Sequence, residues 1–377
     1  MSIIPRLTPS QVAALSTAAV AALTTADIRA LSTAQLAALT TTQIGVMRTA
    51  QVAALISTQV PGLTTAQVQA LTTAQVAALS TAAIGGMETA DIVALTTAQA
   101  AALTSGQMAA LTTGQVAALE VADVAALNVT AVRGITSAQA VALTSAQVQA
   151  LTTAQVAALS TAAVRGLETA DIAALSTAQA AALTTVQVAA LGSGQLAALT
   201  TAQVQALTTA QVAALSTAAI GGMETADIVA LTTAQAGALT SGQMAALTTG
   251  QVAALEVADV AALSSSAIRG IGTAQMAALT SVQALNLSSA QVVALNSAQI
   301  SALSTSSLAA LTSASIVALT TAQVLGLTTG QIGALTSVQV TAMETADIAA
   351  LTSVQVGAFT TTQLGIMTDG QISALFL

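Results

Sequence analysis

The side chains of this sequence that could take part in chemistry are carboxylates and hydroxyls. The 377 residues include no lysine, histidine, cysteine, tyrosine or tryptophan. There are six basic and 14 acidic residues, which gives a net charge of −8. Without imidazole, thiol or amine groups, the chain lacks the usual general bases, nucleophiles and ligands of zinc, haem or iron–sulfur clusters. Nucleic-acid binding requires clustered Lys and Arg, whereas the six arginines are scattered. We therefore expect no enzymatic activity, no cofactor and no nucleic-acid partner.

Pairs of acidic residues are the candidate metal ligands. Six Glu-x-Ala-Asp units place two carboxylates three residues apart, hence on one face of a helix. Calcium takes several carboxylate oxygens, but no Asp-x-Asp-x-Asp-Gly loop or Gly-Gly-x-Gly-x-Asp motif accompanies these pairs. Acidic residues at the start of a helix are also favourable without a ligand, because they complement the helix dipole. We prefer this structural interpretation, with weak calcium binding as the alternative at Glu88, Asp91, Glu168, Asp171, Glu224 and Asp227.

These residues belong to an unbroken repeat of eight residues. Every eighth position from Leu7 to Leu375 is apolar, which gives 46 octads without an insertion or deletion. We expect residues 1–6 to form a short N-terminal lead-in segment and residues 7–377 to form a single uninterrupted array.

Each octad has the sequence features of a complete helix start. In residues 71–78 (LTTAQVAA), Thr72 is expected to cap a helix over residues 73–78, with Gln75 completing a capping box. Leu71 is expected to pack on Val76 as a hydrophobic staple. The glutamine slot, defined as position 11 and every eighth position to 371, holds 31 Gln, 7 Asp, 6 Ala and 2 Ser.

The period of eight argues against the simpler architectures. Eight steps of about 100° would rotate the apolar stripe of one continuous helix by roughly 80° per repeat, and coiled coils need periods near 3.5 or 3.67. In a β-solenoid, Val76 and Leu79 would point to opposite faces, and Ala and Gln are poor strand formers. We expect an all-α solenoid of very short capped helices, one per octad, that are stable only within the array. A β-solenoid is the alternative.

A longer duplication is superimposed on the octads. Residues 80–127 recur almost unchanged at residues 216–263, an offset of 17 octads. If two octads formed one turn, this odd offset would move every copied residue to the opposite face. Either the octads are nearly interchangeable or the turn does not hold two of them.

Neither a Sec signal peptide nor a membrane span is expected. Residues 1–7 (MSIIPRL) lack a basic segment followed by an apolar one. Mean hydropathy is high, at +0.83, yet no window of about 18 residues is free of the recurring Thr, Ser and Gln.

Two resemblances bear on location and partners. Residues 7–15 (LTPSQVAAL) resemble the first helix of transcription-activator-like effector repeats, but the longer period, base-reading loop and basic stripe of that family are missing, so DNA recognition is not expected. More broadly, the Thr-Ala-Gln-Val-Ala-Ala-Leu octads resemble low-complexity repeat proteins that bacteria place on or outside the cell. That resemblance implies an extracellular or cell-surface location, reached without a Sec signal peptide.

The expected function is structural. Solenoids that stay monomeric carry polar capping repeats, whereas both ends of this array are apolar in sequence. A head-to-tail contact between unlike ends propagates, so we expect a rigid rod that assembles end to end into a filament or surface fibre, with low charge permitting lateral packing. The expected interface residues are Ile3, Ile4, Phe359, Phe376 and Leu377.

Two other functions remain open at this point. Paired Thr and Ser residues recur in the octads and could form a regular hydroxyl lattice, as in an ice-binding or surface-adsorbing protein, and thermal hysteresis would separate this function from the first. A solenoid that binds another protein is the second alternative. It is disfavoured because the octads carry few of the aromatic residues that dominate binding hot spots.

Overall fold

The structure is a computed structural model that describes residues 4–376. Within this range it contains 45 α-helices of four to six residues, two 3₁₀ helices and no strand. The predicted all-α solenoid with one short helix per octad is therefore confirmed, and the β-solenoid alternative is wrong.

Contacts divide the chain between Ala190 and Leu191 into two compact units, while the octad register runs through the division without an insertion. The first unit contains η1 Ile4–Arg6, α1 Pro9–Ala13, α2 Thr17–Ala22, α3 Thr25–Arg29, α4 Thr33–Ala38, α5 Thr41–Gly45, α6 Thr49–Val52, η2 Val60–Gly62, α7 Thr65–Ala70, α8 Thr73–Ala78, α9 Thr81–Gly85, α10 Thr89–Val93, α11 Thr97–Ala101, α12 Ser105–Ala110, α13 Thr113–Ala118, α14 Val121–Ala126, α15 Val129–Val132, α16 Ser137–Ala142, α17 Ser145–Ala150, α18 Thr153–Ala158, α19 Thr161–Gly166, α20 Thr169–Ala174, α21 Thr177–Ala182 and α22 Thr185–Ala190. The second unit contains α23 Ser193–Ala197, α24 Thr201–Ala206, α25 Thr209–Ala214, α26 Thr217–Ile220, α27 Thr225–Val229, α28 Thr233–Gly237, α29 Ser241–Ala246, α30 Thr249–Ala254, α31 Val257–Ala262, α32 Ser265–Arg269, α33 Thr273–Ala278, α34 Ser281–Leu285, α35 Ser289–Ala294, α36 Ser297–Ala302, α37 Thr305–Ala310, α38 Ser313–Val317, α39 Thr321–Val324, α40 Thr329–Ala334, α41 Ser337–Ala342, α42 Thr345–Ala349, α43 Ser353–Val356, α44 Thr361–Leu364 and α45 Asp369–Ala374.

Helix α8 shows how an octad starts and ends its helix. The Thr72 side chain accepts a hydrogen bond from the Gln75 backbone N–H, and the Gln75 side chain accepts one from the Thr72 backbone N–H, as the capping box predicts. At the other end, Leu79 has φ −56° and ψ 135°, and the next cap, Ser80, has φ −66° and ψ 155°. Two successive extended residues thus turn the chain, and no described residue needs a positive φ.

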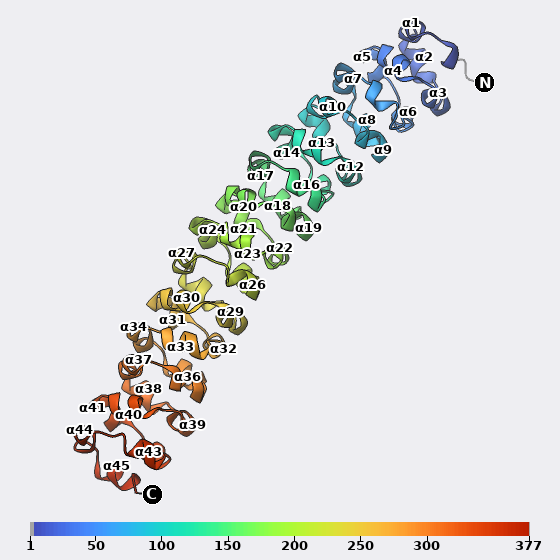
Figure 1. Cartoon of the computed structure of the whole chain (residues 1–377). Helices are drawn as coiled ribbons and strands as arrows, with labels where there is room; N and C mark the ends of the chain where they lie inside the picture. The colour runs from blue at the N-terminus through green and yellow to red at the C-terminus, as the bar shows by residue number, and fades with distance from the viewer. Residues whose placement is uncertain (1–3, 377) are drawn as a thin grey trace. The chain divides into compact units, whose positions relative to one another are not determined.

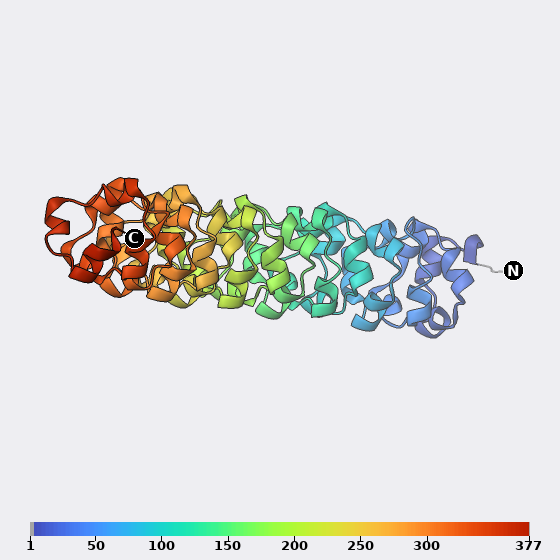
Figure 2. The same cartoon turned by 90° about the horizontal axis from the view of Figure 1, so that it is seen from below.

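Three octads make one turn of the solenoid. Within each unit, helices pack against the helix three octads further along the chain, as in α1 with α4, α16 with α19 and α34 with α37. Figures 1 and 2 show successive helices winding round the interior of each unit. Helices related by three octads stack in what we call a column, so each unit has three columns.

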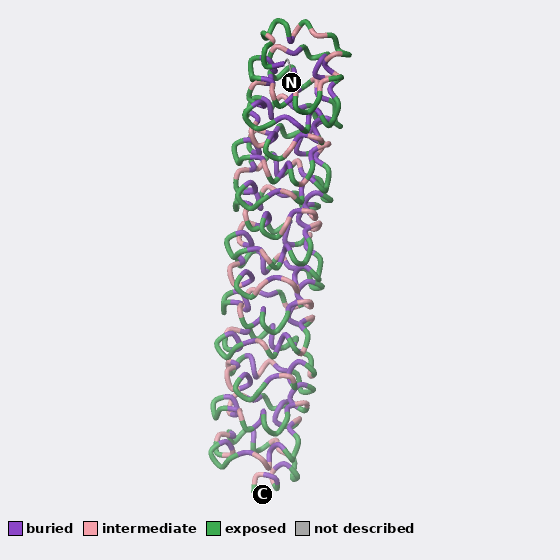
Figure 3. Tube along the Cα trace, turned by 90° about the vertical axis from the view of Figure 1, so that its right-hand side faces the viewer, coloured by how far each residue is buried: buried purple, intermediate pink, exposed green. Residues whose placement is uncertain are grey.

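Three positions of the octads between the first and last turns are buried. In residues 71–78 they are Leu71, Gln75 and Val76, with relative exposures of 4%, 2% and 0%, whereas Thr72 and Thr73 are exposed. The same alternation of buried and exposed chain recurs through each unit (Figure 3). The predicted burial of Leu and Val is confirmed, and a buried glutamine joins them.

One octad departs from the pattern for reasons visible in its sequence. Residues 55–62 form only the 3₁₀ helix η2, because Pro61 lacks the N–H group that an α-helix needs at this position. The column is still continuous, since α4 packs against η2.

The duplicated segment recurs at an offset that is not a multiple of three octads, and its two copies lie in different units. Within the first unit, the identical octads of residues 71–78 and 151–158 lie in different columns, because α8 packs against α11 whereas α18 packs against α15 and α21. Octads are therefore interchangeable between columns.

Every described helix is too short to cross a membrane.

Candidate functional site

The glutamine slot is the most extensive set of buried polar side chains in the described residues. Gln147, at the start of α17, is 1% exposed. Its Oε1 accepts a hydrogen bond from the Thr144 backbone N–H at 2.8 Å, which completes the cap. Its Nε2 donates to the carbonyl oxygens of Val116 at 3.1 Å, Ala117 at 3.2 Å and Leu119 at 2.8 Å.

The two ends of the slot glutamine thus satisfy two different helix termini. The carbonyl groups that accept from Nε2 lie at the C-terminal end of α13, where carbonyl groups lack the N–H partner four residues further on. That of Val116 also accepts from the Leu119 backbone N–H at 3.2 Å. Gln155 repeats the arrangement on Val124, Ala125 and Leu127 at 3.0, 3.2 and 2.7 Å. Each such side chain therefore ties one turn of the solenoid to the preceding turn.

Sequence reasoning assigned the glutamine to the cap and missed its amide group. A signal was present, because a capping box accepts Glu as well as Gln, yet no octad places Glu in the glutamine slot. A carboxylate would fill the same space but could not donate to the carbonyl groups of the preceding turn.

We expect Gln147→Glu to lower the free energy of unfolding by about 2–4 kcal/mol, because it sets a carboxylate against three carbonyl oxygens. Gln149→Glu, on the exposed side of the same helix, should change it by less than about 0.5 kcal/mol. Urea unfolding followed by circular dichroism measures both. Equal losses in the two variants would show that the slot amide has no special role.

The acidic pairs proposed as weak calcium sites combine one buried and one exposed residue. Asp91, Asp171 and Asp227 occupy the glutamine slot and are 3% exposed, whereas their glutamate partners are exposed cap residues. Oδ2 of Asp171 accepts from the Glu168 backbone N–H at 3.2 Å. Its Oδ1 accepts from the Ser145 hydroxyl at 2.8 Å.

The other two pairs have similar local contacts. Oδ2 of Asp91 accepts from the Glu88 backbone N–H at 3.4 Å, and the Asp227 carboxylate accepts from the Glu224 backbone. These contacts are those of residues that cap the start of a helix. Among the described residues, no group of three or more acidic, histidine or cysteine side chains gathers in a way that could hold a metal ion.

Burial in the slot raises the pKa of five aspartates above the ordinary value of 3.8, and the neighbouring cap glutamate acts in the same direction. Hydrogen bonds from the cap backbone or from a threonine hydroxyl partly oppose the rise. The five residues are Asp91, Asp123, Asp227, Asp259 and Asp347.

We expect the protein to unfold at a higher temperature near pH 4 than at pH 7. A raised pKa means that the protonated carboxyl is more favourable in the folded state than in the unfolded state, so protonation stabilises the fold. The stabilisation is complete below the unfolded-state pKa and is lost as the pH rises through the folded-state pKa. Replacing Asp91, Asp227 and Asp347 with Asn should flatten the pH profile of the melting temperature. A profile unaffected by these replacements would show that the buried aspartates do not cause the pH dependence of the melting temperature.

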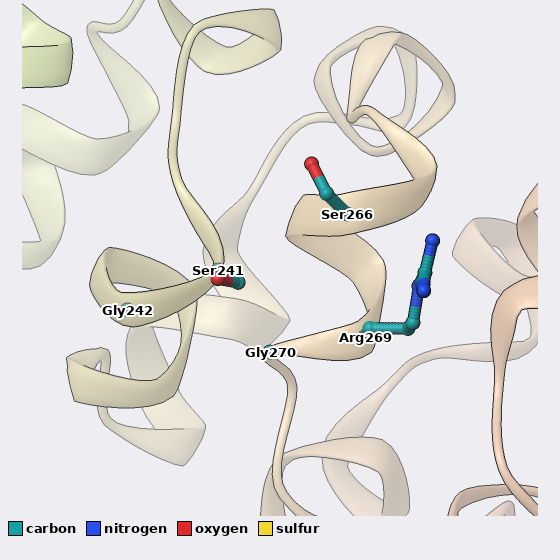
Figure 4. Close-up of a pocket in the computed structure, with 5 residues that line it drawn as sticks. All are labelled: Ser241, Gly242, Ser266, Arg269 and Gly270. Carbon is teal, nitrogen blue, oxygen red and sulfur yellow. The ribbon is translucent and has the colours of Figure 1, made fainter.

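The surface hollow shown in Figure 4 lies between α29 and α32. It has a volume of about 470 Å³ and is lined by Ser241, Gly242, Ser266, Arg269 and Gly270. The Arg269 side chain extends away from Ser241, and its Nε donates to the Ser265 carbonyl at 3.4 Å. The polar groups of this hollow therefore do not converge on one point, as the groups of a ligand site would.

The residues predicted to form an end-to-end interface have different environments. Ile4 is 3% exposed, and its carbonyl oxygen accepts from Gln35 Nε2 at 2.9 Å. Phe359 is 7% exposed, whereas Phe376 is 84% exposed. Ile3 and Leu377 lie outside the described residues.

Comparison with known proteins identifies a repeat family. The sequence model of this family, described as the ALTTAQ repeat, matches ten segments that together span most of the chain: residues 20–57, 53–81, 84–121, 116–153, 152–185, 188–224, 220–257, 252–289, 305–337 and 340–376. Neither the curated proteins nor the solved structures contain a match.

Proposed function

We propose, from the premise that the chain belongs to the ALTTAQ repeat family, that it serves as a non-enzymatic structural element. The chain is a tandem-repeat helical solenoid, and its buried glutamine side chains form hydrogen bonds that join one turn to the next. We further propose that the solenoid acts as a scaffold whose length is set by the number of its turns.

The observation that carries this proposal is the equivalence of the three columns. At Gly134, in the column of α12 and α15, an added Cβ would lie 2.1 Å from the Ser105 carbonyl oxygen, and at Gly166, in the column of α16 and α19 of the same unit, it would lie 2.5 Å from the Ser137 carbonyl oxygen. The same close contact thus persists after a move to another column. A binding protein with one specialised face would not tolerate such a move, whereas a scaffold does.

We further propose that copies of the chain assemble head to tail. In the first turn Gln11 is exposed and Leu15 is partly exposed, whereas the corresponding positions of later turns are buried. In the last turn Leu364 is 37% exposed, whereas the same position in α8, Val76, is fully buried. The first turn of a second copy could cover this layer with the packing already used inside the solenoid.

Light scattering tests the assembly. Wild-type protein should grow in mass with concentration, whereas Phe376→Asp should stay small, because it places a charge at the exposed apolar end. Val186→Asp is the matched control, since Val186 is 65% exposed but lies in the middle of the chain. A monodisperse wild-type monomer at high concentration would reject end-to-end assembly and leave the scaffold function standing.

Location is part of the proposal as well. We place the protein outside the cell or on its surface, and the support is the compositional resemblance of its octads to bacterial surface repeat proteins.

A further inference from the structure

Two equivalent aspartates have a carboxylate oxygen without a hydrogen bond. Asp123 and Asp259 lie 17 octads apart, at matching positions of the duplicated segment, and each is 1% exposed. Oδ2 of each is buried and accepts no hydrogen bond from any described residue. An ionised oxygen in this position needs a positively charged or donating partner.

The glutamine-containing octads show what normally occupies this place. Nε2 of Gln283 lies 3.1 Å from the Val252 carbonyl oxygen, 3.2 Å from that of Ala253 and 2.8 Å from that of Leu255. Three carbonyl oxygens around one point form a strongly negative environment at the C-terminal end of a helix. The two amide hydrogens of glutamine supply the positive charge that this environment favours.

Aspartate replaces that donor with another oxygen. By the spacing of 31, 30 and 28 residues seen for Gln283, the carbonyl groups that correspond to Asp123 are those of Ile92, Val93 and Leu95, and no described side chain donates to them. The Thr97 hydroxyl donates to the other oxygen of the Asp123 carboxylate. Oδ2 of Asp123 is therefore left without a donor among the described residues.

Asp259 has the same surroundings in the second unit. The corresponding carbonyl groups belong to Ile228, Val229 and Leu231, and the Thr233 hydroxyl donates to the other carboxylate oxygen.

Charged side chains near these two sites add no positive charge. Helices α11 and α17 pack against α14, which carries Asp123, and neither contains a charged residue. Helices α28 and α34 pack against α31 in the same way and are also uncharged. The cap residues Glu120 and Glu256 act on these aspartates, and α10 and α27, which supply the carbonyl groups of Ile92 and Ile228, carry Asp91 and Asp227. All four side chains are acidic.

The other slot aspartates show why these two are special. In Asp91 and Asp171, Oδ2 accepts the backbone N–H of the cap residue. The octads of Asp123 and Asp259 read Glu-Val-Ala-Asp instead of Glu-Thr-Ala-Asp, and in neither does the cap residue donate its backbone N–H to Oδ2. Their Oδ2 atoms are left for another partner.

We propose that Asp123 and Asp259 each bind one alkali-metal cation. Its ligands are Oδ2 of the aspartate and carbonyl oxygens of the preceding turn, from Ile92, Val93 and Leu95 in one site and from Ile228, Val229 and Leu231 in the other. Backbone carbonyl oxygens are the ligands that proteins use for such ions. A single carboxylate per site matches a monovalent charge, whereas calcium sites gather several carboxylates.

The line width of the ²³Na nuclear magnetic resonance signal tests this proposal on the full chain at pH 7.5. Wild-type protein should broaden the sodium signal, and excess KCl should sharpen it again, whereas choline chloride at the same ionic strength should not. The double variant Asp123→Gln with Asp259→Gln should abolish the broadening. Glutamine is the residue that the slot holds in most octads, so this variant is expected to fold, and its circular dichroism spectrum should match that of the wild type.

The matched control is the double variant Asp171→Gln with Asp347→Gln, which removes two carboxylates of the same slot that lie outside both sites and accept hydrogen bonds from the Glu168 backbone N–H and the Thr321 hydroxyl. It should broaden the sodium signal as much as the wild type does. No broadening by the wild type would overturn the proposal and point to a proton as the partner of Oδ2. Equal loss of broadening in the two double variants would overturn it as well, since it would reveal diffuse attraction to negative charge.

Discussion

We expect a chain without residues 71–78 to remain folded, whereas a chain without residues 71–74 should lose the packing of about one turn. Removing a whole octad keeps every slot glutamine in register with carbonyl groups of the same kind in the preceding turn. Gln99, which donates to Val68 and Leu71, would then meet Val60 and Leu63, residues of the same types. The free energy of unfolding of this deletion variant should fall only by the contribution of one repeat.

Removing four residues shifts that register for every octad within a turn of the junction. The slot side chains there would no longer face the carbonyl groups of the preceding turn, and Leu and Val positions would fall out of step. We expect a loss on the order of 5 kcal/mol or more, from unsatisfied buried polar groups and lost apolar burial. Urea unfolding of the two deletion variants, each compared with the full chain, measures the difference. Equal losses would mean that register does not hold the solenoid together.

Gly134→Ala should destabilise the protein by about 2–4 kcal/mol, and Gly114→Ala should stabilise it slightly. At Gly134 the new Cβ would lie 2.1 Å from the Ser105 carbonyl oxygen, so two adjacent turns would have to move apart. At Gly114, inside α13, nothing lies within 4 Å, and alanine is favoured over glycine in a helix by about 0.5–1 kcal/mol. Melting temperatures of the two variants should shift in opposite directions.

The same pair of substitutions can be repeated in the second unit as a control. A Cβ at Gly270 would lie 2.0 Å from the Ser241 carbonyl oxygen, whereas the nearest atom at Gly250 is 3.9 Å away. Because no described glycine has a positive φ, backbone conformation does not explain any difference. If Gly134→Ala and Gly270→Ala were neutral, the close approach of the turns would not be a constraint on the sequence.

Local structure was predictable from this sequence because each octad contains its own start and stop signals. Thr72 and Gln75 specify where α8 begins, and the predicted range of residues 73–78 is the one observed. Burial of Leu71 and Val76 follows from the same octad. All of these contacts lie within a few residues along the chain, where sequence patterns are informative.

The number of octads in a turn was not predictable, for a physical reason. Gln75 donates to the carbonyl groups of Ile44 and Met47, but apolar residues with the same roles recur in every octad. Because the repeat is shorter than the turn, the sequence of an octad does not identify the earlier octad whose carbonyl groups accept from its glutamine. The unpartnered Oδ2 of Asp123 could not be predicted either, because the side chain that forms a hydrogen bond with this carboxylate, Thr97, belongs to the preceding turn.

The equivalence of the three columns also has a genetic consequence. A gain or loss of eight codons, by slippage or unequal recombination between near-identical segments, rotates all later helices by one column and leaves every turn-to-turn contact type in place. Most folds require an insertion in an element to be compensated elsewhere, whereas this one needs no compensation. The offset between the copied segments is such a step, since it is a whole number of octads but not a whole number of turns. Selection on a gene of this kind can therefore adjust the length of its product in increments of one third of a turn.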